Sequence, residues 1–142
     1  MTALHLSTKQ WEDMRDHVAA CVPHEACGLL AGHGDAVHEV LPITNRLRSP
    51  TRFRMEPSEQ IRAFAAIEEG GMELIGIFHS HPAFGGAVNA ASPGPSATDI
   101  AEAAYPVVHV IWSRPDGQWA AHAYWIESGR LSDVALKIGD AA

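Results

Sequence analysis

Apolar residues recur at helical spacing in two segments of the 142-residue chain. The first predicted helix is capped by Ser7 or Thr8 and runs to about Cys21, where Pro23 closes the segment. The second starts at Pro57 and ends before a pair of glycines. The apolar positions that carry these two patterns are Trp11, Met14 and Val18 in the first and Ile61, Phe64, Ala65 and Ile67 in the second.

Other segments have the short apolar or alternating pattern of β-strands. The predicted strands are Ala26 to Ala31, Ala36 to Leu41, Thr51 to Met55, Met72 to Ser80, Val107 to Trp112 and Trp119 to Ile126. Turn-like residues join the first two strands and the last two, which indicates two β-hairpins. Because helices and strands are interleaved, we expect an α/β fold, more strictly α+β, with a mixed central sheet flanked by helices in one domain over residues 1–142.

A loop is predicted between the strand that ends near Ser80 and the late hairpin. Ala83 to Pro95 is rich in Gly, Ala and Pro and has no periodicity, and this loop is long for a compact domain. Ser96 to Ala104 then reads as a short helix. Long loops of this kind are often functional.

The composition limits the partners that we expect. The formal net charge is -7, and we take the ten Lys and Arg residues to be dispersed, so we expect no nucleic-acid partner, and a basic or neutral protein is easier to accommodate. The first residues lack the pattern of an export signal and no apolar run is long enough to span a membrane, which predicts a cytoplasmic protein without membrane attachment. Cys21 and Cys27 are then expected to be reduced thiols, with a redox role open for Cys27.

Two histidines end the strand Met72 to Ser80 and its continuation. In an extended strand Ile75, Ile77, His79 and His81 share one face, so two imidazoles continue a buried apolar surface. A single histidine there is more often a hydrogen-bonded core residue than a ligand. Two at alternate positions can direct both Nε2 atoms at one cation, which makes them candidate metal ligands.

A catalytic metal usually has three protein ligands and one open position, so a third ligand must come from elsewhere. Asp99 is the best-placed carboxylate, because it follows the loop that leaves His81 and lies at the start of a predicted helix. The same spacing allows another interpretation, in which Ser96 and Asp99 form a helix capping box. The two interpretations differ in whether the Asp99 carboxylate turns back to the Ser96 backbone or away to a cation.

Glu25 carries little signal on its own, because a glutamate between a helix and a strand is usually a solvated charge. His24 and Glu25 do not start the His-Glu-x-x-His motif of thermolysin-like proteases, since Gly28 occupies the place of the second histidine. The zinc-deaminase motif is also absent from the sequence.

Taken together, these motifs resemble the signature of the JAMM (MPN-plus) metalloprotease family. The matching elements are Glu25 with Cys27-Gly28-Leu29-Leu30, then His79-Ser80-His81-Pro82, then Ser96-Ala97-Thr98-Asp99, supported by Pro42 to Asn45 and Arg52 to Pro57, which resemble the prokaryotic branch. The resemblance covers roughly residues 20 to 127. The chain departs from the family pattern in the loop Ala83 to Pro95, which is longer than the family usually has.

The resemblance implies a single MPN/JAMM domain of cytidine-deaminase-like architecture with a bound Zn²⁺. His79, His81 and Asp99 are then the metal ligands, Glu25 is the general base and acid, and Ser96 donates to the oxyanion of the tetrahedral intermediate. The implied activity is hydrolysis of the amide or isopeptide bond at the C-terminal Gly-Gly tail of a ubiquitin-like or sulfur-carrier protein, and a homodimer is possible.

Two other functions fit parts of the sequence. The first is a non-catalytic MPN-type interaction module, since the family includes members that have lost the metal ligands and act as scaffolds. The presence of all three candidate ligands and of Glu25 speaks against it. The second is a nucleic-acid-associated protein similar to RadC proteins, which carry a similar histidine motif. The net negative charge speaks against that class.

Overall fold

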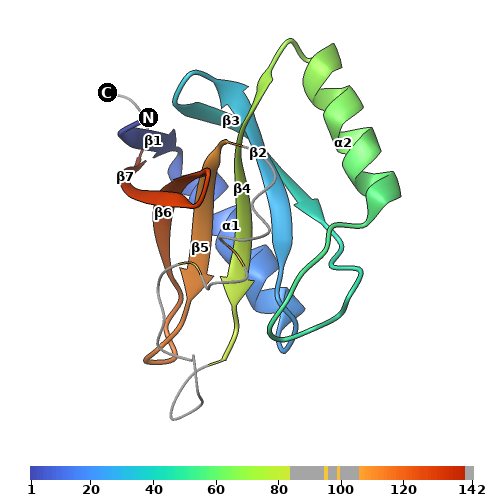
Figure 1. Cartoon of the computed structure of the whole chain (residues 1–142), viewed down its shortest axis with the longest axis vertical. Helices are drawn as coiled ribbons and strands as arrows, with labels where there is room; N and C mark the ends of the chain where they lie inside the picture. Colours follow the sequence, from blue (N-terminus) through green and yellow to red (C-terminus); the bar gives the residue numbers. More distant parts are fainter. Residues whose placement is uncertain (84–94, 96–98, 100–105, 140–142) are drawn as a thin grey trace.

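The computed structural model describes residues 1–83, Pro95, Asp99 and residues 106–139. Helices and strands are interleaved in this part of the chain, as predicted (Figure 1). The elements are β1 (Ala3–Leu6), α1 (Thr8–Cys21), β2 (Cys27–His33), β3 (Ala36–Ile43), α2 (Pro57–Glu69), β4 (Glu73–His81), β5 (Val108–Ser113), β6 (Ala120–Glu127) and β7 (Arg130–Ile138). The expected α+β class with a mixed sheet and flanking helices is confirmed.

The sheet closes on itself, in the order β1-β3-β2-β4-β5-β6-β7. Most neighbouring strands are antiparallel, but β4 and β5 run parallel, so their carboxyl ends lie at the same end of the sheet. β1 completes the ring by pairing in parallel with β7 and, at His5 and Ala36, with β3. The sequence analysis missed β1 and β7, because β1 is very short and much of β7 is exposed, which weakens the alternation of apolar residues.

Each helix covers a different apolar cluster. Ser7 caps α1 through a capping box, in which the Ser7 hydroxyl accepts from the Gln10 backbone N–H and the Gln10 side chain accepts from the Ser7 N–H. Met14 and Val18 of α1 pack into the first core cluster, with Trp112 and Phe78. Helix α2 lies on the second cluster, which includes Cys27, Leu29, Met55, Ala63, Ile67 and Ile77.

The pattern of α2 and β4 differs from the prediction at two isoleucines. Ile61 is 69% exposed, because the buried face of α2 is carried by Ala63 and Ile67. Ile75 and Ile77 belong to different clusters, because the β2–β4 register shifts between Leu30 and Ala31. A bulge of this kind adds a residue to one strand and turns the preceding side chains to the other face. The alternation therefore holds only from Ile77 onward.

Residues 51–55 do not form the predicted strand. Only an isolated bridge joins Met55 to Asn45, and the segment between them is irregular. Most of the predicted loop Ala83 to Pro95 and of the predicted helix Ser96 to Ala104 lies outside the described residues, within which Asp99 is helical. Among the described helices, none combines the length and apolarity that crossing a bilayer requires.

Candidate metal centre

β4 places both histidines at the end of an inner strand. His79 is paired with Cys27 of β2 on one side and with Ile111 of β5 on the other. The His79 imidazole is almost completely buried, whereas the His81 side chain, two residues later, keeps 13% of its surface exposed. Burial lowers the pKa of His79 against the opposing effect of Asp99, so this imidazole is held in the neutral form that a metal ligand needs.

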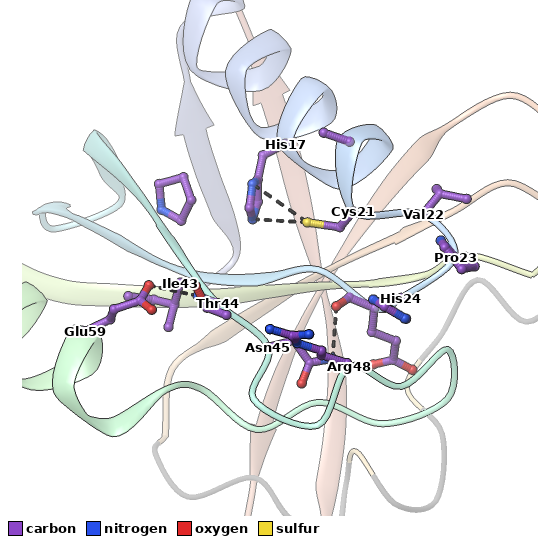
Figure 2. A pocket seen from close by; sticks show the side chains of 13 residues that line it. His17, Cys21, Val22, Pro23, His24, Ile43, Thr44, Asn45, Arg48 and Glu59 are labelled. Carbon is purple, nitrogen blue, oxygen red and sulfur yellow. Dashed lines mark hydrogen bonds between the residues drawn. The ribbon is translucent and has the colours of Figure 1, made fainter.

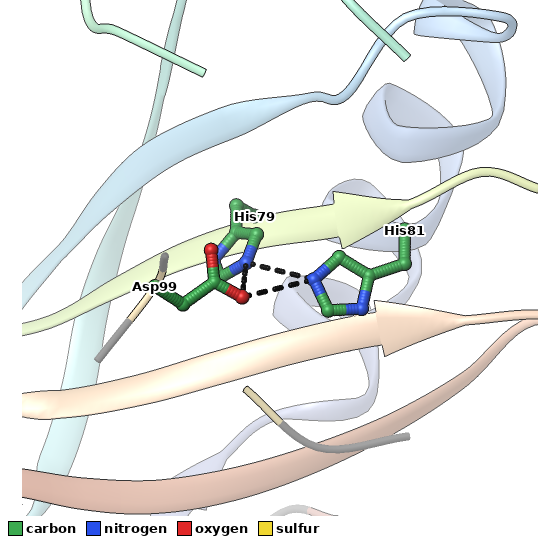
Figure 3. A group of neighbouring side chains, drawn as sticks. All are labelled: His79, His81 and Asp99. Atoms are coloured by element: carbon green, nitrogen blue, oxygen red, sulfur yellow. Dashed lines mark hydrogen bonds and ion pairs between the residues drawn. The ribbon is translucent and has the colours of Figure 1, made fainter. Parts of the chain in front are cut away.

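Asp99 comes to the same point from outside the sheet. Its Oδ2 lies 3.1 Å from Nε2 of His79 and 3.1 Å from Nε2 of His81, and the two Nε2 atoms are 3.2 Å apart (Figure 3). Ligand atoms at about 2.0 to 2.1 Å from a tetrahedral zinc are separated by about 3.3 Å. The three donor atoms therefore fit one divalent cation, and they are the three groups that the sequence predicted.

The direction of the Asp99 carboxylate bears on the two interpretations of this residue. The Asp99 Oδ2 atom faces the two imidazoles, as a metal ligand would. Ser96 lies outside the described residues, so its predicted roles as helix cap and as oxyanion donor remain predictions.

Glu25 is a buried carboxylate next to this cluster. It is 3% exposed, and its Oε1 atom has no hydrogen-bond partner among the described residues. Burial raises its pKa to about 8, while the charge of His81 lowers the pKa and that of Asp99 raises it. A carboxylate that is buried without a partner is costly in a folded protein, which marks the position as a candidate site of proton transfer.

Backbone contacts tie Glu25 to the histidine strand. The next residue, Ala26, donates its N–H to the Ser80 hydroxyl at 2.8 Å and accepts the Ser80 N–H at 3.1 Å. Because Ser80 lies between the two histidines in β4, these bonds set the start of β2 beside the metal ligands. Ser80 is thus a positioning residue to which the sequence analysis assigned no role.

Two further residues of the site were missed. Asn45 is buried, and its Nδ2 atom donates to the Glu25 carbonyl at 3.0 Å. Phe53 stacks on the His79 imidazole, with ring centroids 4.7 Å apart and planes 26° apart. Both belong to segments that resemble the prokaryotic JAMM branch, but one sequence does not show which side chains of such a segment face the site.

Cys27 is an unreactive thiol in this structure. It is fully buried, its Sγ–H donates to the Ile43 carbonyl at 3.4 Å, and burial raises its pKa to about 12. The thiolate is the reactive form of cysteine, and very little of it exists near neutral pH at such a pKa. These properties speak against the redox role that the sequence left open.

A mixed sheet whose inner strand ends in two histidines, with an aspartate and a buried glutamate beside them, defines a metalloprotease-type centre of the JAB-domain class. The family of prokaryotic homologs of the JAB domain (Prok-JAB) matches residues 7–127. The chain belongs to this family, and the expected JAMM relationship is confirmed.

Similar proteins have peptidase names. A desampylase of Haloferax volcanii is 33% identical over 126 residues, which cover 87% of this chain and 86% of the relative. The CysO-cysteine peptidase of Mycobacterium tuberculosis is 35% identical over 125 residues, covering 86% of this chain and 75% of the relative. The solution structure of protein DSY2949 from Desulfitobacterium hafniense superposes with a TM-score of 0.81 at 32% identity, covering 97% of this chain and 94% of that one. The expected enzyme class, a peptidase of the JAMM type, agrees with these names.

Proposed function

We propose that this protein is a zinc-dependent peptidase or isopeptidase. Its substrate is the amide bond at the C-terminal Gly-Gly tail of a ubiquitin-like or sulfur-carrier protein, from which it releases an attached amino acid or protein. The observation that carries the proposal is the convergence of Asp99 on both imidazoles at 3.1 Å, with the buried Glu25 alongside. The names of the desampylase and of the CysO-cysteine peptidase support this substrate class.

The donor set favours zinc as the metal. His79, His81 and Asp99 offer two imidazole nitrogens and one carboxylate oxygen, which is a three-ligand combination that catalytic zinc sites use with one position left open. When bound, Zn²⁺ supplies a Lewis acid and lowers the pKa of a coordinated water to about 7.

The protein side chains would supply proton transfer and orientation. Glu25 is buried and its pKa is raised, so it can take a proton from the nucleophilic water and pass it to the departing amine. Phe53 stacks on His79 and restricts rotation of the imidazole. We assign Ser96 the role of oxyanion donor, as the family resemblance implies.

Metal content and turnover of two variants test this assignment. The substrates are a CysO–cysteine conjugate and a fusion that ends in a Gly-Gly tail, each assayed with and without chelator. Glu25→Gln should keep stoichiometric zinc and lose turnover by about 10³-fold, in the range expected for general acid–base catalysis. His79→Ala should lose both zinc and turnover.

Each alternative has its own result in this experiment. Undiminished turnover in Glu25→Gln would remove Glu25 from the mechanism. A wild-type protein that binds the conjugate in the presence of zinc but never cleaves it would support the non-catalytic interaction module instead.

A further inference from the structure

Residues 46–54, which we call the arginine loop, concentrate positive charge in an acidic protein. Four of the ten Lys and Arg residues of the chain are Arg46, Arg48, Arg52 and Arg54, and no Asp or Glu occurs between Glu39 and Glu56. The expectation that basic residues are dispersed is therefore wrong in this segment. The net charge of the chain is -7, so the residues outside the loop together carry -11.

A buried amide holds the arginine loop in shape. The Asn45 side chain donates to the carbonyls of Glu25 and Arg52, and its Oδ1 accepts the N–H groups of Leu47 and Arg54, with distances of 3.0 to 3.1 Å. A backbone bond of 2.8 Å from the Arg46 N–H to the Arg54 carbonyl closes the two ends. The loop is thus a defined surface, although it contains no helix or strand.

The arginine loop borders the candidate metal centre. Its Ser49 carbonyl accepts the Glu25 N–H at 2.8 Å, and its Phe53 ring lies on His79. Arg48 and Glu25 also line one cavity of about 500 Å³, together with Asn45 and His24 (Figure 2). The loop that carries the arginines is therefore in direct contact with two residues of the candidate centre, Glu25 and His79.

Three of the four guanidinium groups, those of Arg46, Arg48 and Arg54, are available for a partner. All four arginines are exposed, and the side chains of Arg46, Arg48 and Arg54 make no hydrogen bond or ion pair with the described residues. Like charges at this density repel one another, and an opposite charge on a bound partner would relieve that repulsion.

We propose that the arginine loop docks an acidic face of the protein substrate, holding its folded body while the tail lies in the metal centre. This inference rests on the proposed function and adds the charge of the substrate surface to it. A protein with local carboxylates fits better than a nucleic acid, because a polyphosphate chain extends beyond the loop onto a molecule that carries -11 elsewhere. Exposed complementary charges act mainly on encounter and affinity rather than on the chemical step.

The test compares two substrates that share the tail and differ in the folded body. One is the CysO–cysteine conjugate, and the other is a short uncharged peptide that ends in Gly-Gly-Cys. The loop variant is Arg46→Glu with Arg48→Glu. The matched control is Arg130→Glu with Lys137→Glu, which makes the same charge change on exposed residues of β7, a strand separated from β4 by β5 and β6.

The loop variant should raise KM for the conjugate about 10-fold more than KM for the peptide, with kcat within about twofold for both. The control variant should change the ratio of the two KM values by less than about twofold. Raising NaCl from about 50 to 500 mM should increase the wild-type KM for the conjugate and leave that of the loop variant nearly constant.

Other outcomes overturn the proposal in distinguishable ways. Equal losses for conjugate and peptide, or equal KM ratios in loop and control variants, would show that the arginine loop does not dock the substrate body. If the loop variant instead lost binding of a 20-nucleotide single-stranded RNA and kept its KM for the conjugate, the loop would belong to a nucleic-acid surface. If the zinc-loaded wild type cleaved neither substrate, the proposed function itself would fail.

Discussion

The two halves of the candidate centre are held by different kinds of structure. His79 and His81 lie on β4, an inner strand that is hydrogen-bonded to β2 and β5 along its length. The opposite wall, from Asn45 to Met55, contains one isolated bridge and depends on the side chain of Asn45.

This difference has a consequence for how the centre tolerates substitution. The position of a strand residue depends on many ladder hydrogen bonds, so one side-chain change leaves its backbone in place. The loop wall has only a few backbone hydrogen bonds and depends largely on the four hydrogen bonds of a single buried amide. One substitution there can therefore release Glu25 and the arginines together, whereas a ligand substitution on the strand side should remove the metal and leave the wall intact.

The largest effect is expected from substitution of Asp99, the candidate ligand that does not lie on β4. Asp99→Asn replaces the only anionic donor of the three, so zinc affinity should fall by at least about 10²-fold and turnover with it. Zinc competition with a chromophoric chelator measures the affinity, and the circular dichroism spectrum should match that of the wild type. Full zinc retention would show that Asp99 is not a ligand.

Asn45→Ala tests the loop wall directly. It should destabilise the protein by about 1 to 3 kcal/mol, because it leaves the carbonyl of Glu25 without its donor, and kcat should fall about 10- to 100-fold with zinc still bound. Asn45→Asp keeps the acceptor for the Leu47 and Arg54 N–H groups and loses only the donor to the Glu25 and Arg52 carbonyls. Its losses of stability and kcat should therefore come from these two carbonyls alone.

The control for the loop wall is Glu59→Gln. Glu59 accepts the Thr44 N–H at 3.0 Å next to the same segment, but no hydrogen bond joins its side chain to Glu25 in the described structure. Its kcat should stay within about twofold of the wild type. A similar kcat loss in both variants would mean that general loosening, rather than the Glu25 contact, causes the effect.

The pH dependence of stability tests the burial of Glu25. In the metal-free protein its pKa is raised to about 8 from an ordinary 4.5, so between these values the folded state binds more protons than the unfolded chain. The stability from protonated Glu25 is complete below pH 4.5 and is lost as pH rises to about 8. The loss is up to about 1.4 kcal/mol per pH unit.

Glu25→Gln removes this titration and keeps the shape of the side chain. The Tm of the metal-free wild type, minus that of the variant, should therefore decrease from pH 5 to about 8 in calorimetric scans. A constant difference would indicate that Glu25 ionises in the folded protein as it does in the unfolded chain.

The smallest effect concerns the contact between the two halves. Phe53→Leu removes the ring that stacks on His79, and an aromatic pair of this kind contributes about 0.5 to 1.5 kcal/mol. Zinc affinity should fall a few-fold in Phe53→Leu, whereas Phe53→Tyr, which keeps the aromatic ring, should have the affinity of the wild type. An unaltered affinity in Phe53→Leu would show that the sheet alone orients His79.

Local patterns predicted much of the fold and the chemical groups of the centre. The spacing of apolar residues located both described helices and five of the strands, and two histidines at alternate positions next to a buried run indicated a metal site. These predictions succeed because helix and strand periodicities depend on neighbouring residues. The prediction of a strand over 51–55 failed because its apolar and charged residues alternate like a strand, although within the described residues the segment pairs only through the bridge from Met55 to Asn45.

The sequence by itself determined which side chains could bind a metal and that His79 and His81 share a face. Only the tertiary structure decided that Asp99 meets both imidazoles, that Glu25 is buried beside them, and that the sheet closes through β1 and β7. It also decided that the arginine loop, spread along an irregular segment, forms one surface at the centre. The physical reason is that local steric preferences set periodicity, whereas convergence depends on contacts between distant segments.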